Sequence, residues 1–343
     1  MAASDTVARR GYHVGVDVGG TKILAVATPA EPARESGSWG RSGPAAVLAE
    51  AEQVTVTTAV PRIVDELVSD LRRQLAPAPL LGIGVGLPGL VTTAGVLRYG
   101  PNLAGAQELD LAGWLGSRHG VVASVDNDGN CAAWAEHRLG AGRGSDDMVF
   151  VGLGTGISCG LVVGGRAVRG RSGFAGEAGH MIVRTGGARC ACGRTGCWEA
   201  SASGSALAAQ AQWATRQGRA DALVALAGGD RKAVRGEHVT AGLRVGEPAA
   251  VRIATAFAGW VALGLVNVVH LLDPTVVVLG GSVLDDAEPW MGLINAAYAQ
   301  LVMQPSLRTA TTLSPAQLGR RAGAIGAAVL AGEGEAIRLD PRV

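Results

Sequence analysis

A cluster of one histidine and three cysteines constrains the fold of this chain more than any other feature. His180, Cys190, Cys192 and Cys197 occur in the stretch GEAGHMIVRTGGARCACGRTGCWE, where intervening glycines allow the backbone to turn tightly. One imidazole and three thiolates make a complete tetrahedral ligand set for Zn²⁺. A site closed by four protein ligands leaves no position for water, so it is expected to hold a loop in place rather than to perform chemistry.

Two other interpretations of the cysteines are a disulfide with one cysteine to spare and a set of small buried apolar residues. A Cys-x-Cys pair has poor geometry for a disulfide, and no feature of the sequence indicates secretion. The pattern therefore favours zinc. Glu177 and Glu199 lie on either side of the zinc loop (residues 180–197), so this loop is also expected to form a wall of a polar ligand site.

Composition excludes several classes of function. The 343 residues suffice for two domains with a large core, and a net charge of +1 gives no electrostatic basis for binding nucleic acid or an acidic membrane surface. No apolar run follows a basic segment at the N-terminus, so no secretory signal is expected, and residues 1–10 are interpreted as a flexible tail. With few cysteines, the chain is expected in the reducing cytoplasm.

One apolar stretch, IATAFAGWVALGLVNVV at residues 253–269, could be mistaken for a membrane span. It is shorter than the roughly 20 apolar residues that cross a bilayer. It also contains Asn267 and lies between Arg252 and His270. A buried core helix is the better interpretation, and no membrane partner is expected.

Apolar runs and glycine turns predict an α/β chain with a repeated motif. Strands are expected at residues 13–16, 23–27, 80–85, 121–125, 148–153, 160–163 and 275–279, helices at 60–75, 130–139 and 322–331, and a loop at 28–44. A strand, a glycine turn with threonine and a second strand follow one another at two places in the chain. This weak internal repeat suggests two domains of like topology.

The two glycine turns can bring backbone N–H groups close to a phosphate because no Cβ intervenes. Either turn alone would be an ordinary hairpin turn. The first, however, also carries Asp17, which can hold Mg²⁺ directly or through water, and Lys22, which can offset phosphate charge. The pair therefore favours phosphate binding, by Asp17, Gly19, Gly20, Thr21 and Lys22 in the first turn and by Gly154, Thr155 and Gly156 in the second.

Three polar residues, Asp126, Asn127 and Asp128, follow the predicted strand at 121–125 and precede the predicted helix at 130–139. Open α/β sheets bind their ligands at this end of the strands. Helix capping explains one of the three residues more easily than all of them. Asp128 is therefore a candidate functional residue.

Segments along nearly the whole chain resemble the ROK family of bacterial sugar kinases and sugar-responsive repressors, and within it the zinc-containing glucokinases. In chain order they are GVDVGGTKILAVA, GVGLPGLV, the PN of GPNLAG, VDNDGNCAAWAE, LGTGISCG, GEAGHMIV, CACGRTGCWE and DPTVVVLGGSV. They run in the family's order from residue 15 to 283, and the zinc segment is highly specific.

The resemblance implies an actin-like, hexokinase-type (ribonuclease H-like) fold, in which two α/β domains close on sugar and nucleotide in an interdomain cleft. Residues 11–125 with a C-terminal helix at 322–336 would form the small domain, and residues 126–321 the large domain with the zinc loop. Asp128 would be the catalytic base, and Gly280 and Gly281 would meet the nucleoside end of ATP. The residues implied to bind the sugar are Pro88, Gly89, Asn102, Asn127, Glu177, His180 and Glu199.

The implied reaction is phosphate transfer from ATP to glucose, giving glucose 6-phosphate, with Mg²⁺ and a structural Zn²⁺ as cofactors and a homodimer or homotetramer as the assembly. The same motifs serve kinases of N-acetylmannosamine, N-acetylglucosamine and fructose, so the preferred sugar stays open, as does ATP against polyphosphate as the donor. A non-catalytic sugar-binding regulator is a further alternative. A sugar-sensing repressor would carry a long DNA-binding segment before the first glycine turn, whereas the first strand is expected here from residue 13.

The chain departs from the family pattern at two places. The family usually has Glu-Asn-Asp-Ala-Asn where this chain has Asp-Asn-Asp-Gly-Asn at residues 126–130, and Ser158 and Cys159 stand where glycines are common. Neither departure removes a residue with an implied role. Both leave the turnover rate open.

Overall fold

The computed structural model describes residues 11–30, 46–100, 103, 107–304, 306–307 and 309–333. The expected tail at 1–10, most of the loop expected at 28–44 and the end of the helix expected at 322–336 lie outside these residues. The chain divides into two compact units, each described separately below. Met1–Asp146, Gly160–Gly176 and Gln317–Val343 form the first unit, and Asp147–Cys159 and Glu177–Ala316 form the second.

The first unit is built on a five-stranded sheet with the order β3-β2-β1-β4-β7. β1 (Tyr12–Val18) and β2 (Lys22–Pro29) form the predicted hairpin, and β4 (Leu80–Leu87) and β7 (Val122–Asn127) continue the sheet in parallel with β1. The edge strand β3 (Ala49–Val54) was not predicted, because its sequence AEAEQV lacks the β-branched alternation that marks a strand. β2 also runs into the region that was expected to be a loop.

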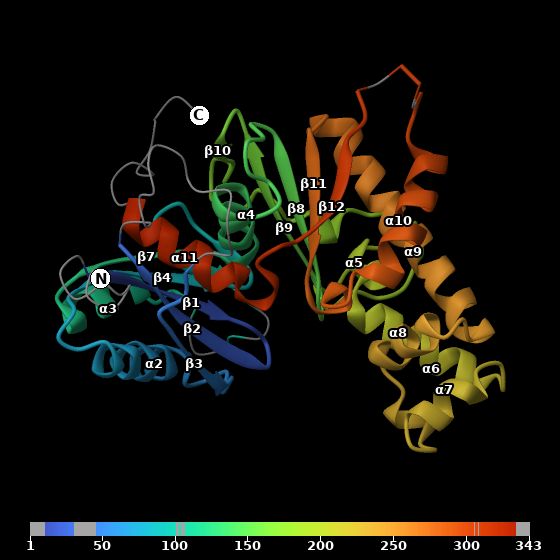
Figure 1. The fold of residues 1–343 in the computed structure, drawn as a ribbon, viewed down its shortest axis with the longest axis horizontal. Helices are drawn as coiled ribbons and strands as arrows, with labels where there is room; N and C mark the ends of the chain where they lie inside the picture. Colours follow the sequence, from blue (N-terminus) through green and yellow to red (C-terminus); the bar gives the residue numbers. More distant parts are fainter. Residues whose placement is uncertain are drawn as a thin grey trace. The chain divides into compact units, whose positions relative to one another are not determined.

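Helices cover both faces of this sheet. α11 (Ala322–Glu333) lies against β1 and β4 on one face, whereas α2 (Val60–Gln74) and α3 (Leu111–His119) lie on the other, as Figure 1 shows. α4 (Asp128–Leu139) follows β7 and packs against α11. The short strands β5 (Leu90–Val91) and β6 (Leu97–Tyr99) form a separate pair.

α11 approaches the sheet so closely that two strand positions admit only glycine. A Cβ on Gly15 of β1 would lie 1.9 Å from the carbonyl oxygen of Ala324, and one on Gly84 of β4 would lie 1.9 Å from that of Ala327. Because side chains alternate between the faces of a strand, Asp17 lies on the same face as Gly15. A Cβ on Gly323 would accordingly lie 2.6 Å from the Asp17 carboxyl carbon, so this side chain faces the first turn of α11.

The second sheet has the order β10-β9-β8-β11-β12. β8 (Met148–Leu153) and β9 (Ile157–Val163) are joined by the second glycine turn, β10 (Arg166–Ala167) pairs with β9, and β11 (Val276–Gly280) runs parallel to β8 and to β12 (Thr312–Pro315). In both sheets a glycine turn joins two neighbouring strands, and the first of these also pairs with a parallel strand. The internal repeat that was expected from the sequence is therefore present as a repeated strand plan.

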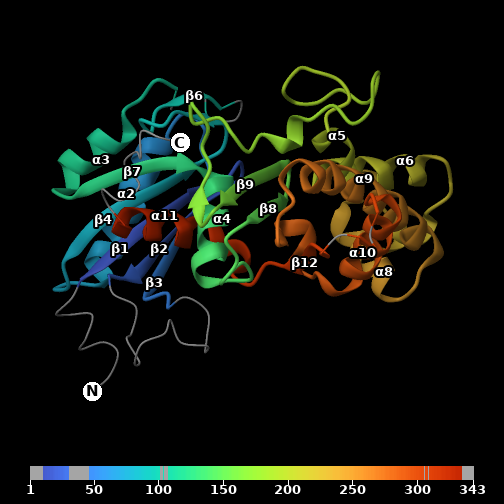
Figure 2. The ribbon, with the colours of Figure 1, turned by 90° about the horizontal axis from the view of Figure 1, so that it is seen from above.

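The helices of the second unit surround α9 (Pro248–Leu272), which is long and apolar enough to cross a membrane by length and composition alone. Its apolar side is buried, including Phe257, Val261 and Leu265, and it packs against α10 (Glu288–Leu301). The interpretation as a core helix is confirmed. The other helices are α5 (Glu199–Ala202), α6 (Gly204–Arg216) and α8 (Gly236–Arg244), labelled in Figure 2, and α7 (Asp221–Leu226), labelled in Figure 1.

α4 belongs to the first compact unit, whereas the domain boundary inferred from the sequence places it in the second domain. The physical reason is a buried carboxylate near its C-terminal end. Oε1 of Glu136 accepts hydrogen bonds from the backbone N–H groups of Gln317 (3.0 Å) and Leu318 (2.8 Å), and Oε2 accepts one from Ala141 (2.8 Å). Glu136 thus ties α4 to the chain that enters α11.

Glu136→Gln should lower the free energy of unfolding by about 1–3 kcal/mol, because the amide NH₂ cannot accept and one buried backbone donor would lose its partner. Chemical denaturation of both proteins measures the difference. Glu66→Gln is the control, since Glu66 forms an exposed ion pair with Arg62 one helical turn away and should cost at most about 0.5 kcal/mol. Equal stability losses in the two variants would contradict the proposed role of Glu136.

Candidate functional site

Three neighbouring strands of the first unit end at the same edge of the sheet, and the two outer ones, β1 and β7, carry polar residues there. The parallel register pairs Asp17 of β1 with Gly86 of β4, and Gly86 with Asp126 of β7. Pro88 and Gly89 directly follow β4, and Asn127 ends β7. The structure therefore brings together most of the residues of the first unit that the sequence assigns to ligands. Asn102, the remaining predicted sugar contact of this unit, lies outside the described residues.

Asn127 connects the end of β7 to its surroundings. Its side-chain amide donates a hydrogen bond to the carbonyl oxygen of Gly89 (3.1 Å), and its side-chain oxygen caps α4 by accepting from the N–H of Asn130 (3.2 Å). Asp128 is the first residue of α4, and its Oδ1 accepts from the N–H of Gly129 (2.8 Å). A carboxylate here interacts favourably with the N–H groups of the first helical turn.

Asp17 lies in dry surroundings beside the first turn of α11. Desolvation raises the pKa of its carboxyl from 3.8 to about 6. A cation next to the carboxylate would favour its charged form and reverse this shift. Hard divalent cations prefer carboxylate oxygens, so the chemistry of this position fits the Mg²⁺ ion that the sequence implies.

The first glycine turn is held from both sides. Within it, the N–H of Gly19 donates to the carbonyl oxygen of Lys22 (2.9 Å), and the hydroxyl of Thr55 donates to the carbonyl oxygen of Gly19 (2.7 Å). The ammonium group of Lys22, expected to meet phosphate, lies 2.6 Å from a carboxylate oxygen of Glu52 and is largely exposed. Lys22 can therefore approach a phosphate only by sharing or leaving Glu52.

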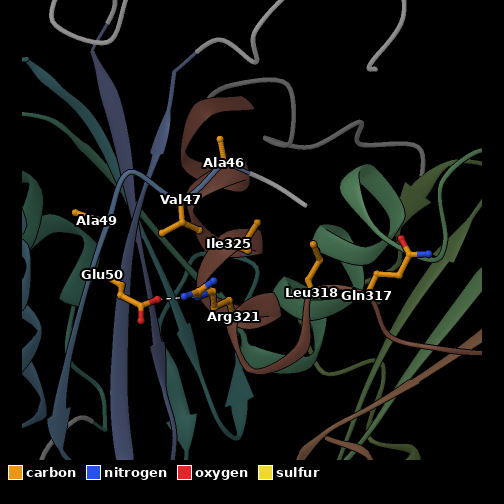
Figure 3. A pocket seen from close by; sticks show the side chains of 8 residues that line it. All are labelled: Ala46, Val47, Ala49, Glu50, Gln317, Leu318, Arg321 and Ile325. Carbon is orange, nitrogen blue, oxygen red and sulfur yellow. Dashed lines mark hydrogen bonds and ion pairs between the residues drawn. The ribbon is translucent and has the colours of Figure 1, made fainter. Parts of the chain in front are cut away.

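A hollow of about 630 Å³ lies near this charged edge of the first unit and contains none of the residues predicted from the sequence. Figure 3 shows Arg321 reaching Glu50 of β3 across it, with the Nε of Arg321 2.6 Å from a carboxylate oxygen of Glu50. Arg320 bridges Glu50 and Glu52 at 3.0 and 2.9 Å. Glu50 and Arg321, the charged side chains that line the hollow, are thus paired with each other.

The second unit brings the four predicted zinc ligands together. The ligand atoms of His180, Cys190, Cys192 and Cys197 all lie within 4.8 Å of one another. The Sγ of Cys190 is 3.7 Å from the Nδ1 of His180, and the Sγ atoms of Cys192 and Cys197 are also 3.7 Å apart. Bond lengths of about 2.0–2.3 Å to a tetrahedral zinc place neighbouring ligand atoms roughly 3.5–3.8 Å apart, so the donor set and its spacing fit Zn²⁺.

The predicted sugar contacts of the second unit lie at this cluster. His180 turns its other nitrogen, Nε2, toward Glu177, whose carboxylate oxygen is 3.8 Å away. Burial raises the pKa of Glu177, the charge of His180 opposes this shift, and the carboxylate of Glu199 adds to it, which places all three side chains in one neighbourhood. His180 can thus serve a metal with one nitrogen and a polar ligand with the other.

Glu199 also makes contacts that the sequence does not reveal. Its Oε2 accepts a hydrogen bond from the N–H of Ile157 (2.9 Å), directly after the second glycine turn, and its Oε1 lies 3.4 Å from the Sγ of Cys190. Two further bonds hold the turn: Gly204 donates to the carbonyl oxygen of Gly154 (2.7 Å), and the Ser205 hydroxyl donates to that of Thr155 (2.8 Å). The chain that leaves the zinc loop therefore holds the second glycine turn.

Trp198 anchors this segment in the core of the second unit. Its side chain is fully buried, and its indole N–H donates to the carbonyl oxygen of Trp260 on α9 (2.8 Å). A Cβ on Gly264 would lie 1.9 Å from the indole ring, so glycine is required there for the ring to lie against α9. Glu199, which follows Trp198, is placed on a rigid support.

A second hollow, of about 720 Å³, lies beside the second glycine turn within the same unit. Gly281 packs its backbone against Leu153, immediately before that turn. The hollow is also lined by polar residues that belong to no sequence motif, because they lie on α8 and its flanks and in the loop after β11. These residues are Arg235, Glu237, Thr240, Arg244, Asp285 and Asp286. Arg244 is paired with Asp286 at 2.5 Å. The turn and this hollow together can take a phosphate and an attached polar group.

Comparison with known proteins agrees with this geometry. The model of the ROK family matches residues 13–333. A glucokinase from Streptomyces coelicolor is 33% identical over 331 residues, which cover 95% of this chain and 99% of that protein. A kanosamine kinase from Amycolatopsis mediterranei is 32% identical over 325 residues, covering 94% and 96% of the two chains.

A crystal structure of a ROK family glucokinase from Streptomyces griseus, in complex with glucose and AMPPNP, matches with a TM-score of 0.82 and 34% identity. The match covers 94% of this chain and 100% of that one. The expected actin-like, hexokinase-type α/β fold is thereby confirmed. The chain belongs to the ROK family.

Proposed function

We propose that this ROK sugar kinase transfers the γ-phosphoryl group of ATP to glucose, giving glucose 6-phosphate, with Asp128 as the general base. The observation that carries the proposal is the polar edge of the first sheet, where Asp17 near the end of β1 and Asn127 and Asp128 at the end of β7 lie on either side of the end of β4. The similarity to glucokinases, one of them crystallised with glucose and AMPPNP, supports the choice of substrates.

On the acceptor side, Asp128 takes the proton of the sugar hydroxyl while the hydroxyl oxygen attacks the γ-phosphorus of ATP. The bond between this phosphorus and the bridging oxygen of ADP breaks, and ADP leaves. General-base assistance of this kind is typically worth about 10²–10⁴-fold in rate. Asn127, Glu177, His180 and Glu199, with Pro88, Gly89 and Asn102, are proposed to orient the sugar hydroxyls.

On the donor side, the backbone N–H groups of the two glycine turns are proposed to stabilise negative charge on the phosphates. The hollow beside Gly154 and Gly281 is proposed to take the nucleoside, which adds Arg235, Glu237 and Thr240 to the residues inferred from the sequence. Asp17 would hold Mg²⁺, which when bound offsets phosphate charge. The four ligands of the zinc loop would hold a structural Zn²⁺, which when bound braces His180 and the chain leading to Glu199.

Amino sugars are the second group of candidate substrates, because the sequence identity to a kanosamine kinase (32%) is nearly the same as that to a glucokinase (33%). A coupled ADP-release assay should compare glucose, mannose, fructose, kanosamine, N-acetylglucosamine and N-acetylmannosamine, with ATP and polyphosphate as donors. The proposal expects the highest kcat/KM for glucose with ATP. A homodimer or homotetramer in the cytoplasm remains the proposed state of the enzyme.

Asp128→Asn should lower kcat by at least about 10²-fold with glucose binding largely kept, because the amide keeps the shape of the side chain but cannot accept the proton. Steady-state kinetics and glucose calorimetry on the folded variant measure both quantities. Asp110→Asn, which changes only an exposed N-cap of α3, is the control and should keep kcat. Normal turnover of the Asp128 variant would exclude this residue as the base.

Asp17→Asn should stabilise the metal-free protein at pH 7–8 and leave stability unchanged below about pH 4. The folded-state pKa of Asp17 is raised to about 6, so the neutral form is favoured in the folded state and its contribution is lost as pH rises from about 4 through 6. The rise of the pKa from 3.8 to about 6 sets an upper limit of about 3 kcal/mol for the gain. Thermal unfolding across pH measures it, and added Mg²⁺ should raise the Tm of the wild type alone.

A wild-type protein whose stability above pH 6 equals that of the Asp17 variant would show that the carboxylate carries no desolvation cost. An equal effect of Mg²⁺ on both proteins would place the ion elsewhere.

Protein purified without added metal should contain about one equivalent of zinc, and Cys192→Ser should lose it. If zinc braces His180 and Glu199, the variant should show losses of about 10–100-fold in kcat/KM for glucose. The KM for ATP should also rise, because Glu199 contacts the N–H of Ile157 next to the second glycine turn. Metal analysis and separate kinetics for the two substrates give the result. A variant with a lower Tm but unchanged kcat and unchanged KM values would show that the zinc only stabilises the fold.

A further inference from the structure

Arg169, which belongs to no sequence motif, forms the ion pair that holds the end of β7. It lies just after β10, and its Nε and Nη2 atoms are each 2.7 Å from Oδ2 of Asp126. The side chains of Arg169 and Asp126 are only 20% and 14% exposed. An arginine that is largely withdrawn from water, donates a hydrogen bond through Nε and brings Nη2 against the same carboxylate oxygen is held far more firmly than an exposed ion pair.

The second oxygen of Asp126 is used as well. Oδ1 accepts from the backbone N–H of Asn127 (2.7 Å) and from the side-chain amide of Asn130 (2.9 Å). Asp126 therefore divides its two oxygens between Arg169 on one side and the start of α4 on the other. With both oxygens engaged inside the chain, its role is to orient its neighbours.

The neighbours of Asp126 are the residues on which the proposed reaction depends. Asn127 is fixed at its N–H by Asp126, at its amide by Gly89 and at its oxygen by Asn130. Asp128 follows Asn127 and begins α4. A movement of the Asp126 carboxylate would thus pass directly into the backbone that carries the base.

Arg169 also supplies positive charge where carboxylates gather. These charges lie around the buried thiol of Cys131, which is one turn into α4. Its pKa is raised by burial and then by the charges of Asp126, Asp17 and Asp128, whereas Arg169 lowers it. Without the guanidinium, Asp126 would be a largely buried carboxylate near those of Asp17 and Asp128, and nearby like charges repel.

We propose that Arg169 is a positioning residue for the base loop (residues 126–128), acting through Asp126. The expected kinetic effects rest on the proposed function, whereas the ion pair between Arg169 and Asp126 is independent of it. Because Arg169 lies on the acceptor side, its loss should disturb the base and the sugar and leave the donor side unaffected.

Arg169→Gln should lower kcat by about 10–100-fold and raise the KM for the sugar, because a small misplacement of a reacting group has costs of this size. The KM for ATP should stay within about twofold. Arg169→Lys keeps the charge but lacks the planar fork, so it should recover part of the loss. Arg171→Gln, an exposed position on the same segment, is the control and should change none of these values by more than about twofold.

A double-mutant cycle with Asp126→Asn identifies the route of the effect. If Arg169 acts through Asp126, the double variant should lose much less than the product of the two single losses. Independent, multiplying effects would overturn the proposal, as would a kcat and sugar KM of Arg169→Gln within twofold of the wild type in an active enzyme.

Hydrogen exchange separates this inference from the proposed function. Amides at residues 127–130 should exchange faster in Arg169→Gln than in the wild type, whatever substrate the protein uses, whereas Arg171→Gln should leave them unchanged. Failure of the wild type to phosphorylate any sugar tested would reject the proposed function alone. Unchanged exchange at residues 127–130 in the folded Arg169 variant would reject the positioning role by itself.

Discussion

The close approach of α11 to β1 and β4 is the constraint on which the first unit depends. Glycines at positions 15 and 84 let the helix backbone touch the strands directly, and Gly326 lets the same helix approach the carbonyl group of Cys131 on α4. Helix, sheet and α4 are therefore fixed to one another by backbone contact, with no long side chains between them. The edge of the sheet that carries Asp17 and the start of α4 inherits this rigidity, which a proposed catalytic site needs.

Local motifs made much of this arrangement predictable. The hairpins, the glycine turns and the polar run at residues 126–128 each depend on neighbours in the sequence, so their patterns identified them. Arg169 could not be found this way, because its partner lies 43 residues earlier and the segment around it has no motif of its own. The polar lining of the hollow beside Gly154 and the membership of α4 in the first unit likewise depend on tertiary contacts.

The zinc loop illustrates both sides of this limit. Its four ligands are close in the chain, and a tetrahedral site demands particular residue types, so sequence alone predicted the cluster that the structure assembles. The hydrogen bond from the N–H of Ile157 to Glu199, in contrast, joins residues 42 positions apart in the chain. The motifs around these two residues suggest separate functions, so the sequence did not predict this contact. One carboxylate thereby links the wall proposed for the sugar to the turn proposed for phosphate.

Among the described residues of the first unit, carboxylates outnumber the cations that are free to balance the negative charge of a nucleotide. Asp17, Asp126 and Asp128 gather around one buried thiol, and the phosphates of a nucleotide would bring further negative charge. Lys22, the cation expected from the sequence, is engaged by Glu52. Arg169 is committed to Asp126. The raised pKa of Asp17 reflects a carboxylate that its dry surroundings leave poorly stabilised. A divalent cation at Asp17 would supply what these side chains do not, because it stabilises the carboxylate and the phosphates at once. The charges of the first unit thus support the proposed Mg²⁺, as does the chemistry of phosphoryl transfer.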